Sequence, residues 1–177
     1  MNIEALFDRA GAPARQAVPD VIRWGVISAA CTTLVAGAMD MFGLLPPAMP
    51  DSAFDLTARG LPNAFLRGAI LAPVSETLIL GALYALLTTA FASRGAAVVA
   101  GLGMAAIHAL KGWPAAVCLL IPALILAAPF ASPRLSWRGA LLRSAGIHAV
   151  HNACVILLAA IVIQLTGGNG WTLAPGP

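Results

Sequence analysis

Residues 71–84 read LAPVSETLILGALY, an apolar stretch whose one charged side chain is Glu76. No aspartate or glutamate follows Glu76 in the sequence. A carboxylate at the centre of a bilayer costs roughly 2.5–3.5 kcal/mol on insertion scales, so such a residue usually faces a protein interior or a wet cavity. The stretch therefore predicts a membrane-spanning helix and marks Glu76 as a candidate functional residue.

The composition of the whole chain agrees with a membrane protein. Of its 177 residues, 60% are hydrophobic and 10% are charged, whereas soluble domains use about 45–50% apolar and about 25% charged residues. The formal net charge of +3 comes from arginines and one lysine at the ends of apolar segments. Such charges are typical of topology signals, and no basic patch with interleaved aromatics predicts a nucleic-acid partner.

The apolar segments predict an all-α fold, a polytopic transmembrane bundle of about five spans. Residues 1–20 are expected to be a cytoplasmic or interfacial segment, 21–165 a single transmembrane domain, and 166–177 a tail. A re-entrant third segment would change the number of crossings. The expected spans are residues 21–45, 62–92, 96–110, 115–131 and 141–165, with a turn at 93–95.

Five crossings distribute the basic residues unequally between the two sides of the membrane. The positive-inside bias then places the N-terminus in the cytoplasm and the C-terminus outside. The richer side carries Arg9, Arg15, Arg23, Arg94, Arg134, Arg138 and Arg143, and the poorer side carries Arg59, Arg67 and Lys111.

Polar side chains recur in two of the other apolar segments. His108 lies near the end of the third, and His148, His151 and Asn152 lie in the fifth. Because His148 and Asn152 are four residues apart, they share one helix face, with His151 on the same flank. Any one of these groups has an ordinary explanation, as a hydrogen bond to a neighbouring helix.

Together with Glu76, these side chains have the chemistry of peptide-bond hydrolysis. A carboxylate acts as general base toward water, an imidazole relays the proton, and imidazole and amide donors stabilise an oxyanion. The same Glu76, His108 and His148 also suit zinc, which is an alternative. The sequence has no HExxH pair, so a site without a metal cofactor is the main expectation.

Three short motifs carry a family resemblance. Ala72-Pro73 leads into Glu76, Met104 precedes His108 by four residues, and His148 precedes Asn152 by four. In this order they resemble the AP-x-x-EExxxR, FxxxH and HxxxN/D motifs of the CPBP intramembrane endopeptidases. That group includes CAAX prenyl proteases and abortive-infection-type proteins. The resemblance covers about half of the chain, residues 72–158.

Two positions depart from the first motif of that family. Thr77 stands in place of the second glutamate, and Gly81 in place of the arginine. Losing both partners of an ion pair avoids leaving one buried charge uncompensated. In the alternative register Ser75 and Glu76 align with the two glutamates, and Leu80 falls at the arginine.

The resemblance implies a glutamic-type endopeptidase in the inner membrane of a bacterium, acting on a membrane-associated or lipidated peptide. Glu76 and His108 are expected to activate water, and His148 and Asn152 to stabilise the oxyanion. His151 and Thr77 are expected to support these groups from behind. The substrate and the oligomeric state stay open.

Two other functions fit the same residues. One is a catalytically inactive scaffold or partner-binding protein, which the changes at Thr77 and Gly81 would allow. The other is a small proton-coupled transporter, since an intramembrane glutamate with histidines is typical of proton pathways. The absence of an internal sequence repeat disfavours the transporter.

Overall fold

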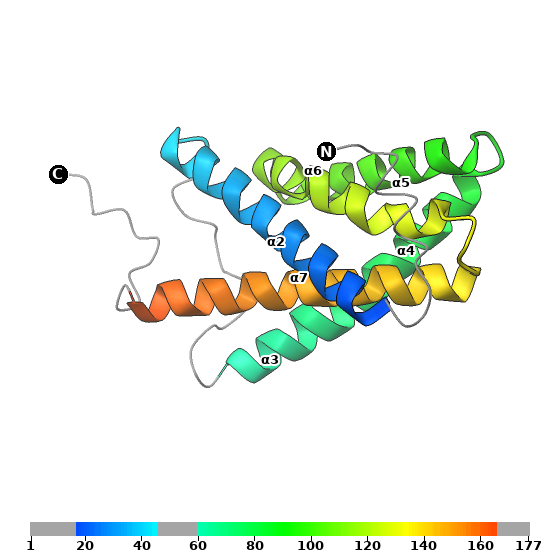
Figure 1. Ribbon diagram of the computed structural model, residues 1–177. Helices are drawn as coiled ribbons and strands as arrows, with labels where there is room; N and C mark the ends of the chain where they lie inside the picture. The colour runs from blue at the N-terminus through cyan, green and yellow to red at the C-terminus, as the bar shows by residue number, and fades with distance from the viewer. Residues whose placement is uncertain (1–16, 46–59, 166–177) are drawn as a thin grey trace.

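A computed structural model describes residues 17–45 and 60–165, and helices are the only regular structure in these ranges (Figure 1). The all-α fold is therefore confirmed. The segment before residue 17, the connector 46–59 and the tail from residue 166 lie outside the described residues. The helices are α2 Ala17–Met41, α3 Leu61–Phe65, the π-helix η2 Leu66–Leu71, α4 Ala72–Leu87, α5 Ser93–His108, the 3₁₀ turn η3 Ala109–Lys111, α6 Trp113–Ala127, the 3₁₀ turn η4 Ala128–Ala131 and α7 Trp137–Leu165.

Five helical segments in the described ranges are long and apolar enough to cross a membrane. They correspond in order to the five expected spans and mark the chain as an integral membrane protein. The third is 19 residues long, more than the sequence pattern predicted. The segments are Val18–Met41, Leu61–Leu87, Ser93–Lys111, Trp113–Ala131 and Trp137–Leu165.

The turn expected at residues 93–95 is wrong by several positions. The second span ends at Leu87, and Ser93 already belongs to α5. Thr88 and Thr89 follow Leu87, and their hydroxyls donate to the carbonyls of residues 85 and 86, each at 2.7 Å. Backbone bonds of the turn continue as far as Phe91, so the chain leaves the α-helix at residues 88–91, earlier than the apolar pattern suggests.

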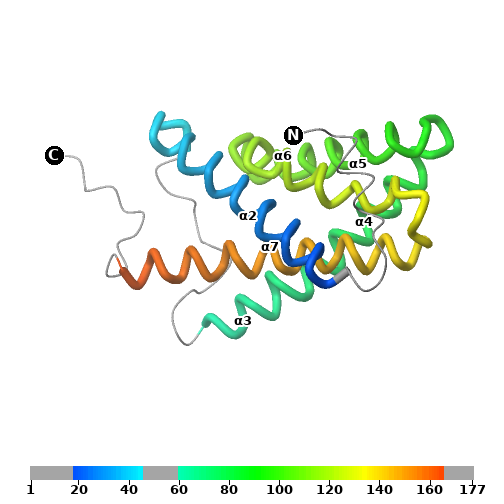
Figure 2. The backbone as a smooth tube through the Cα atoms, in the orientation of Figure 1, coloured from blue at the N-terminus to red at the C-terminus, as the bar shows by residue number. Residues whose placement is uncertain are grey.

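The longest of the described helices, α7, packs against α2, α3, α4 and α6 (Figure 1). In this view α2 crosses α7 diagonally, and α5 and α6 lie next to each other. Figure 2 follows the backbone from α3 through η2 into α4, and all three elements pack against α7. The second and fifth spans therefore lie side by side over much of their length.

Hydroxyl groups satisfy backbone carbonyls near the prolines of the fourth span. Pro122 lies inside α6 and has no N–H to donate to the carbonyl of Cys118, four residues earlier. Thr32 of α2 donates to that carbonyl at 3.4 Å. Ser144 of α7 donates to the carbonyl of Leu126 at 2.8 Å, where the last turn of α6 gives way to η4. These bonds join α2 and α7 to α6.

Candidate functional site

Glu76, His108 and His148 meet at one point, although they come from α4, α5 and α7. Glu76 Oε2 lies 3.7 Å from His108 Nε2 and 3.5 Å from His148 Nε2. The Glu76 side chain is 27% exposed, whereas those of His108 and His148 are 16% and 9% exposed. The structure thus brings three of the four expected catalytic residues together around a carboxylate that is still partly accessible.

The ring of His108 is oriented by its own helix. Its Nδ1 lies 2.9 Å from the carbonyl oxygen of Met104, one turn earlier. Because a carbonyl only accepts, this contact assigns the proton to Nδ1. In the neutral ring Nε2 is then an acceptor, and it faces an oxygen of Glu76 that also accepts when ionised. A proton shared between the two atoms, or a water molecule that donates to both, satisfies this pair.

His148 packs against a second histidine, which in turn contacts a serine of α2. The rings of His148 and His151 meet edge to face, with centroids 6.4 Å apart. His151 Nδ1 lies 2.9 Å from the Oγ of Ser28, whose side chain is completely buried. His151 thus lies beside His148, and its supporting role stays a prediction. Ser28 was not expected, because a single serine in an apolar helix forms no motif.

Asn152 makes a different contact from the one that its expected role requires. Its Nδ2 donates to the carbonyl of Gly68 in η2 at 2.7 Å. Among the described residues, no hydrogen bond or ion pair joins Asn152 to Glu76. One of the two amide N–H groups is therefore engaged by the backbone of the second span, and the oxyanion role stays a prediction.

Thr77 and Gly81 lie one turn apart on the buried face of α4. Thr77 is 2% exposed, and its hydroxyl has no hydrogen-bond partner in the described part of the protein. A Cβ on Gly81 would lie 3.1 to 3.3 Å from atoms of Leu141, Phe130 and Trp137. Packed side chains thus fill the space that a side chain at residue 81 would need, and neither position carries a charge.

The zinc alternative requires its three ligands to surround one point closely. Zinc binds nitrogen and carboxylate oxygen at about 2.0–2.2 Å. Within residues 17–45 and 60–165, no three side chains of His, Cys, Asp or Glu are grouped in a way that could hold a metal ion. The zinc alternative stays a prediction.

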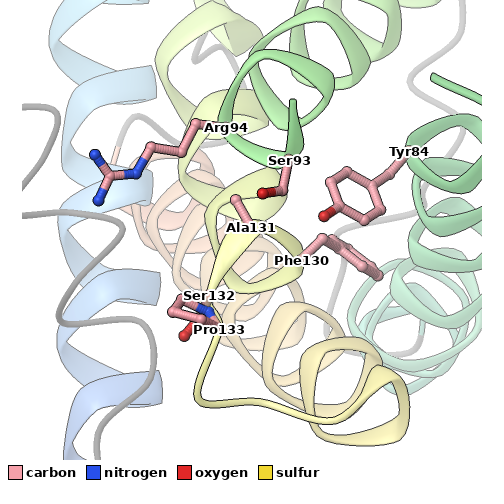
Figure 3. Close-up of a pocket in the computed structure, with 7 residues that line it drawn as sticks. All are labelled: Tyr84, Ser93, Arg94, Phe130, Ala131, Ser132 and Pro133. Atoms are coloured by element: carbon pink, nitrogen blue, oxygen red, sulfur yellow. The ribbon is translucent and has the colours of Figure 1, made fainter. Parts of the chain in front are cut away.

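A cavity of about 270 Å³ lies elsewhere, at the turn between α4 and α5 (Figure 3). Its lining includes Tyr84, Ser93, Arg94 and Phe130. The hydroxyl of Tyr84 points toward Ser93, while the guanidinium of Arg94 points away from both. No expected site residue lines this cavity. Its lining residue Tyr84 lies eight residues, about two helical turns, beyond Glu76 on α4.

The cluster of Glu76, His108 and His148 can hold a water molecule between a carboxylate and an imidazole, with a second imidazole facing the same carboxylate. This arrangement allows water to be activated or a proton to be passed between helices.

Comparisons of the chain with protein-family models, with curated proteins and with solved structures find no match.

Proposed function

We propose that the protein is an intramembrane glutamic-type endopeptidase that hydrolyses a peptide bond in a membrane-associated or lipidated substrate. The observation that carries the proposal is the position of Glu76 Oε2 between His108 Nε2 and His148 Nε2. The motifs similar to those of CPBP endopeptidases support it, because the three residues that converge in space are the ones that those motifs select.

In the first step, Glu76 takes a proton from a water molecule as the oxygen attacks the carbonyl carbon of the peptide. His108 accepts a hydrogen bond from the same water through Nε2, since its Nδ1 proton is engaged by Met104. The peptide carbonyl becomes a tetrahedral oxyanion, and His148 donates a hydrogen bond to it when Nε2 carries the proton. Glu76 then gives its proton to the leaving nitrogen, the carbon–nitrogen bond breaks, and the carboxylate is restored.

The proposal is tested with purified protein and synthetic peptides, each containing one apolar segment with or without an S-farnesylated C-terminal cysteine. Wild type is expected to release defined fragments, identified by mass spectrometry. Glu76→Gln keeps the size of the side chain but removes the base, and general bases contribute about 10²–10⁴-fold to rate. Asp40→Asn is the matched control, because Asp40 is exposed on α2 and is expected to leave cleavage unchanged. Equal cleavage by wild type and Glu76→Gln would contradict the mechanism.

A chelator separates the zinc alternative from the metal-free one. If Glu76, His108 and His148 act without a metal, cleavage continues after treatment with a strong chelator. Loss of cleavage that returns on addition of zinc would instead assign these side chains to a metal site.

The second candidate, a proton-coupled transporter, is favoured by a line of polar groups through the bundle. Ser28, His151, His148, Glu76 and His108 follow one another across α2, α7, α4 and α5. Vesicles that contain the protein and a pH-sensitive dye test this candidate. Proton flux that depends on Glu76, without any peptide cleavage, would replace the protease by the transporter.

The third candidate, an inactive scaffold, is favoured by the packing around Gly81 and by the uncharged Thr77. The related motif carries a second glutamate and an arginine at these two positions, and this chain has neither. The scaffold predicts neither cleavage nor proton flux in the two assays above.

We further propose that the membrane is the inner membrane of a bacterium and that the N-terminus is cytoplasmic. The starts of α2, α5 and α7 fall on the same side when the five spans alternate in direction, and they carry Arg23, Arg94 and Arg138. Reporter fusions to the two termini test this orientation. A cytoplasmic signal from a C-terminal fusion would contradict it.

A further inference from the structure

The hydrogen bond from Asn152 to Gly68 lies where the second span departs from α-helical geometry. In the π-helix η2 each backbone hydrogen bond joins residues five apart, and the N–H of Ala72 donates to the carbonyl of Arg67. The next bond in this pattern would join the N–H of residue 73 to the carbonyl of Gly68. Residue 73 is proline, which has no N–H. The carbonyl of Gly68 therefore lacks its partner within the helix.

Asn152 supplies the missing donor from α7. Its Nδ2 lies 2.7 Å from the Gly68 oxygen, and Gly68 is buried. An unsatisfied backbone carbonyl in the membrane interior is strongly unfavourable, because no water is present to replace the lost bond. The amide thus joins α7 to the second span near Pro73, where the helix has no backbone N–H for the Gly68 carbonyl.

This junction lies next to the contact between Glu76 and His148. Glu76 follows Pro73 by three residues, a rise of about 4.5 Å, and His148 precedes Asn152 by four, a rise of about 6 Å. A shift of the turn that leads into Pro73 would carry α4, and with it the Glu76 carboxylate, away from His148. The bond at Gly68 opposes such a shift, because it ties that turn to α7.

We propose that Asn152 is a positioning residue: by capping the Gly68 carbonyl that Pro73 leaves open, it fixes the register of α4 against α7 and holds Glu76 beside His148. The activity measured below rests on the proposed function, whereas the hydrogen bond does not. The rival role for Asn152 is direct donation to the oxyanion, and that role does not depend on Pro73.

A double-mutant cycle between Asn152 and Pro73 separates the two roles. Asn152→Leu keeps nearly the shape of the side chain but removes both N–H groups. Pro73→Ala restores a backbone N–H that can donate to Gly68. The positioning role predicts that Asn152→Leu lowers kcat at least tenfold, that Pro73→Ala alone stays within about threefold of wild type, and that the double variant regains most of the loss. An equal loss in both backgrounds would assign the amide to the oxyanion and overturn the proposal.

Thermal unfolding of the same four proteins in detergent tests the cap without any substrate. Asn152→Leu is expected to lower the unfolding midpoint in the Pro73 background and to have a smaller effect in the Pro73→Ala background. Equal shifts in the two backgrounds would overturn the proposal. If wild type cleaves no peptide while the midpoints show this coupling, the proposed function fails and the cap stands.

Discussion

Replacing Gly25 by alanine should force α2 and α7 apart. An ideal Cβ at this position would lie 2.5 Å from both Cβ and Cγ1 of Val150 and 3.0 Å from the carbonyl oxygen of Ile147. Because carbon atoms pack at about 3.5–4.0 Å, the two helices must separate by about 1 Å. The clash involves the base of a β-branched side chain and backbone, so rotation of Val150 cannot relieve it.

The separation should also break a hydrogen bond one turn away. The 2.9 Å contact between Ser28 and His151 would lengthen to about 4 Å, beyond hydrogen-bond distance. Overpacking costs about 1–3 kcal/mol, and an interhelical hydrogen bond in a membrane is worth about 0.6 kcal/mol on average. Removing a helical glycine returns about 0.5–1 kcal/mol. We therefore expect Gly25→Ala to lower the free energy of unfolding by about 1–3 kcal/mol.

Reversible unfolding in mixed detergent micelles measures this change. Gly37→Ala is the matched control, because Gly37 lies on the same helix and a Cβ there would have no atom within 4 Å. The control should be as stable as wild type or slightly more stable. If Gly25→Ala unfolds at the same denaturant concentration as Gly37→Ala, the close approach of α2 and α7 at Val150 is wrong.

Two further substitutions test individual hydroxyl groups by the same unfolding measurement. Ser144→Ala leaves the Leu126 carbonyl without the bond at 2.8 Å and should destabilise the protein by about 1 kcal/mol; an unchanged stability would show that this carbonyl has another donor. Thr77→Val removes a buried hydroxyl that has no partner in the described residues and should leave the stability unchanged or raise it by up to about 1 kcal/mol. A loss above about 1 kcal/mol would show that the Thr77 hydroxyl is bonded, for example to a buried water.

The broad fold could be predicted because a membrane imposes simple rules on sequence. Only a helix satisfies its own backbone in hydrocarbon, so each long apolar segment specifies one element. The charged and turn-forming residues between the segments then separate the spans. The boundary near Thr88 was missed because apolar residues continue at 90–92, beyond the end of the helix at Leu87.

The cluster around Glu76 was accessible from sequence for a related reason. Because a carboxylate and imidazoles are unfavourable in hydrocarbon, such side chains face the interior of the bundle and pair with one another there. Ser28 was missed because a hydroxyl in an apolar helix can bond its own backbone and needs no partner on another helix.

The contact of Asn152 depends on a detail that the sequence does not specify. Because Pro73 has no N–H, the sequence predicts that one carbonyl of the second span lacks its donor. In an α-helix that carbonyl would belong to Ala69, four residues earlier, whereas in the π-helical ladder it belongs to Gly68. The sequence does not specify which of these geometries the second span adopts, so the contact between Asn152 and Gly68 is visible only in the structure.

Cleavage in water enriched in heavy oxygen tests most directly whether Glu76 activates water inside this bundle. A peptide cleaved by wild type should carry one heavy oxygen in its new carboxylate, as mass spectrometry of the fragment would show. Glu76→Gln, folded to the same extent, should form this labelled fragment at least about 10²-fold more slowly. Labelled product formed at the same rate by both proteins, or no labelled product from wild type, would contradict hydrolysis centred on Glu76.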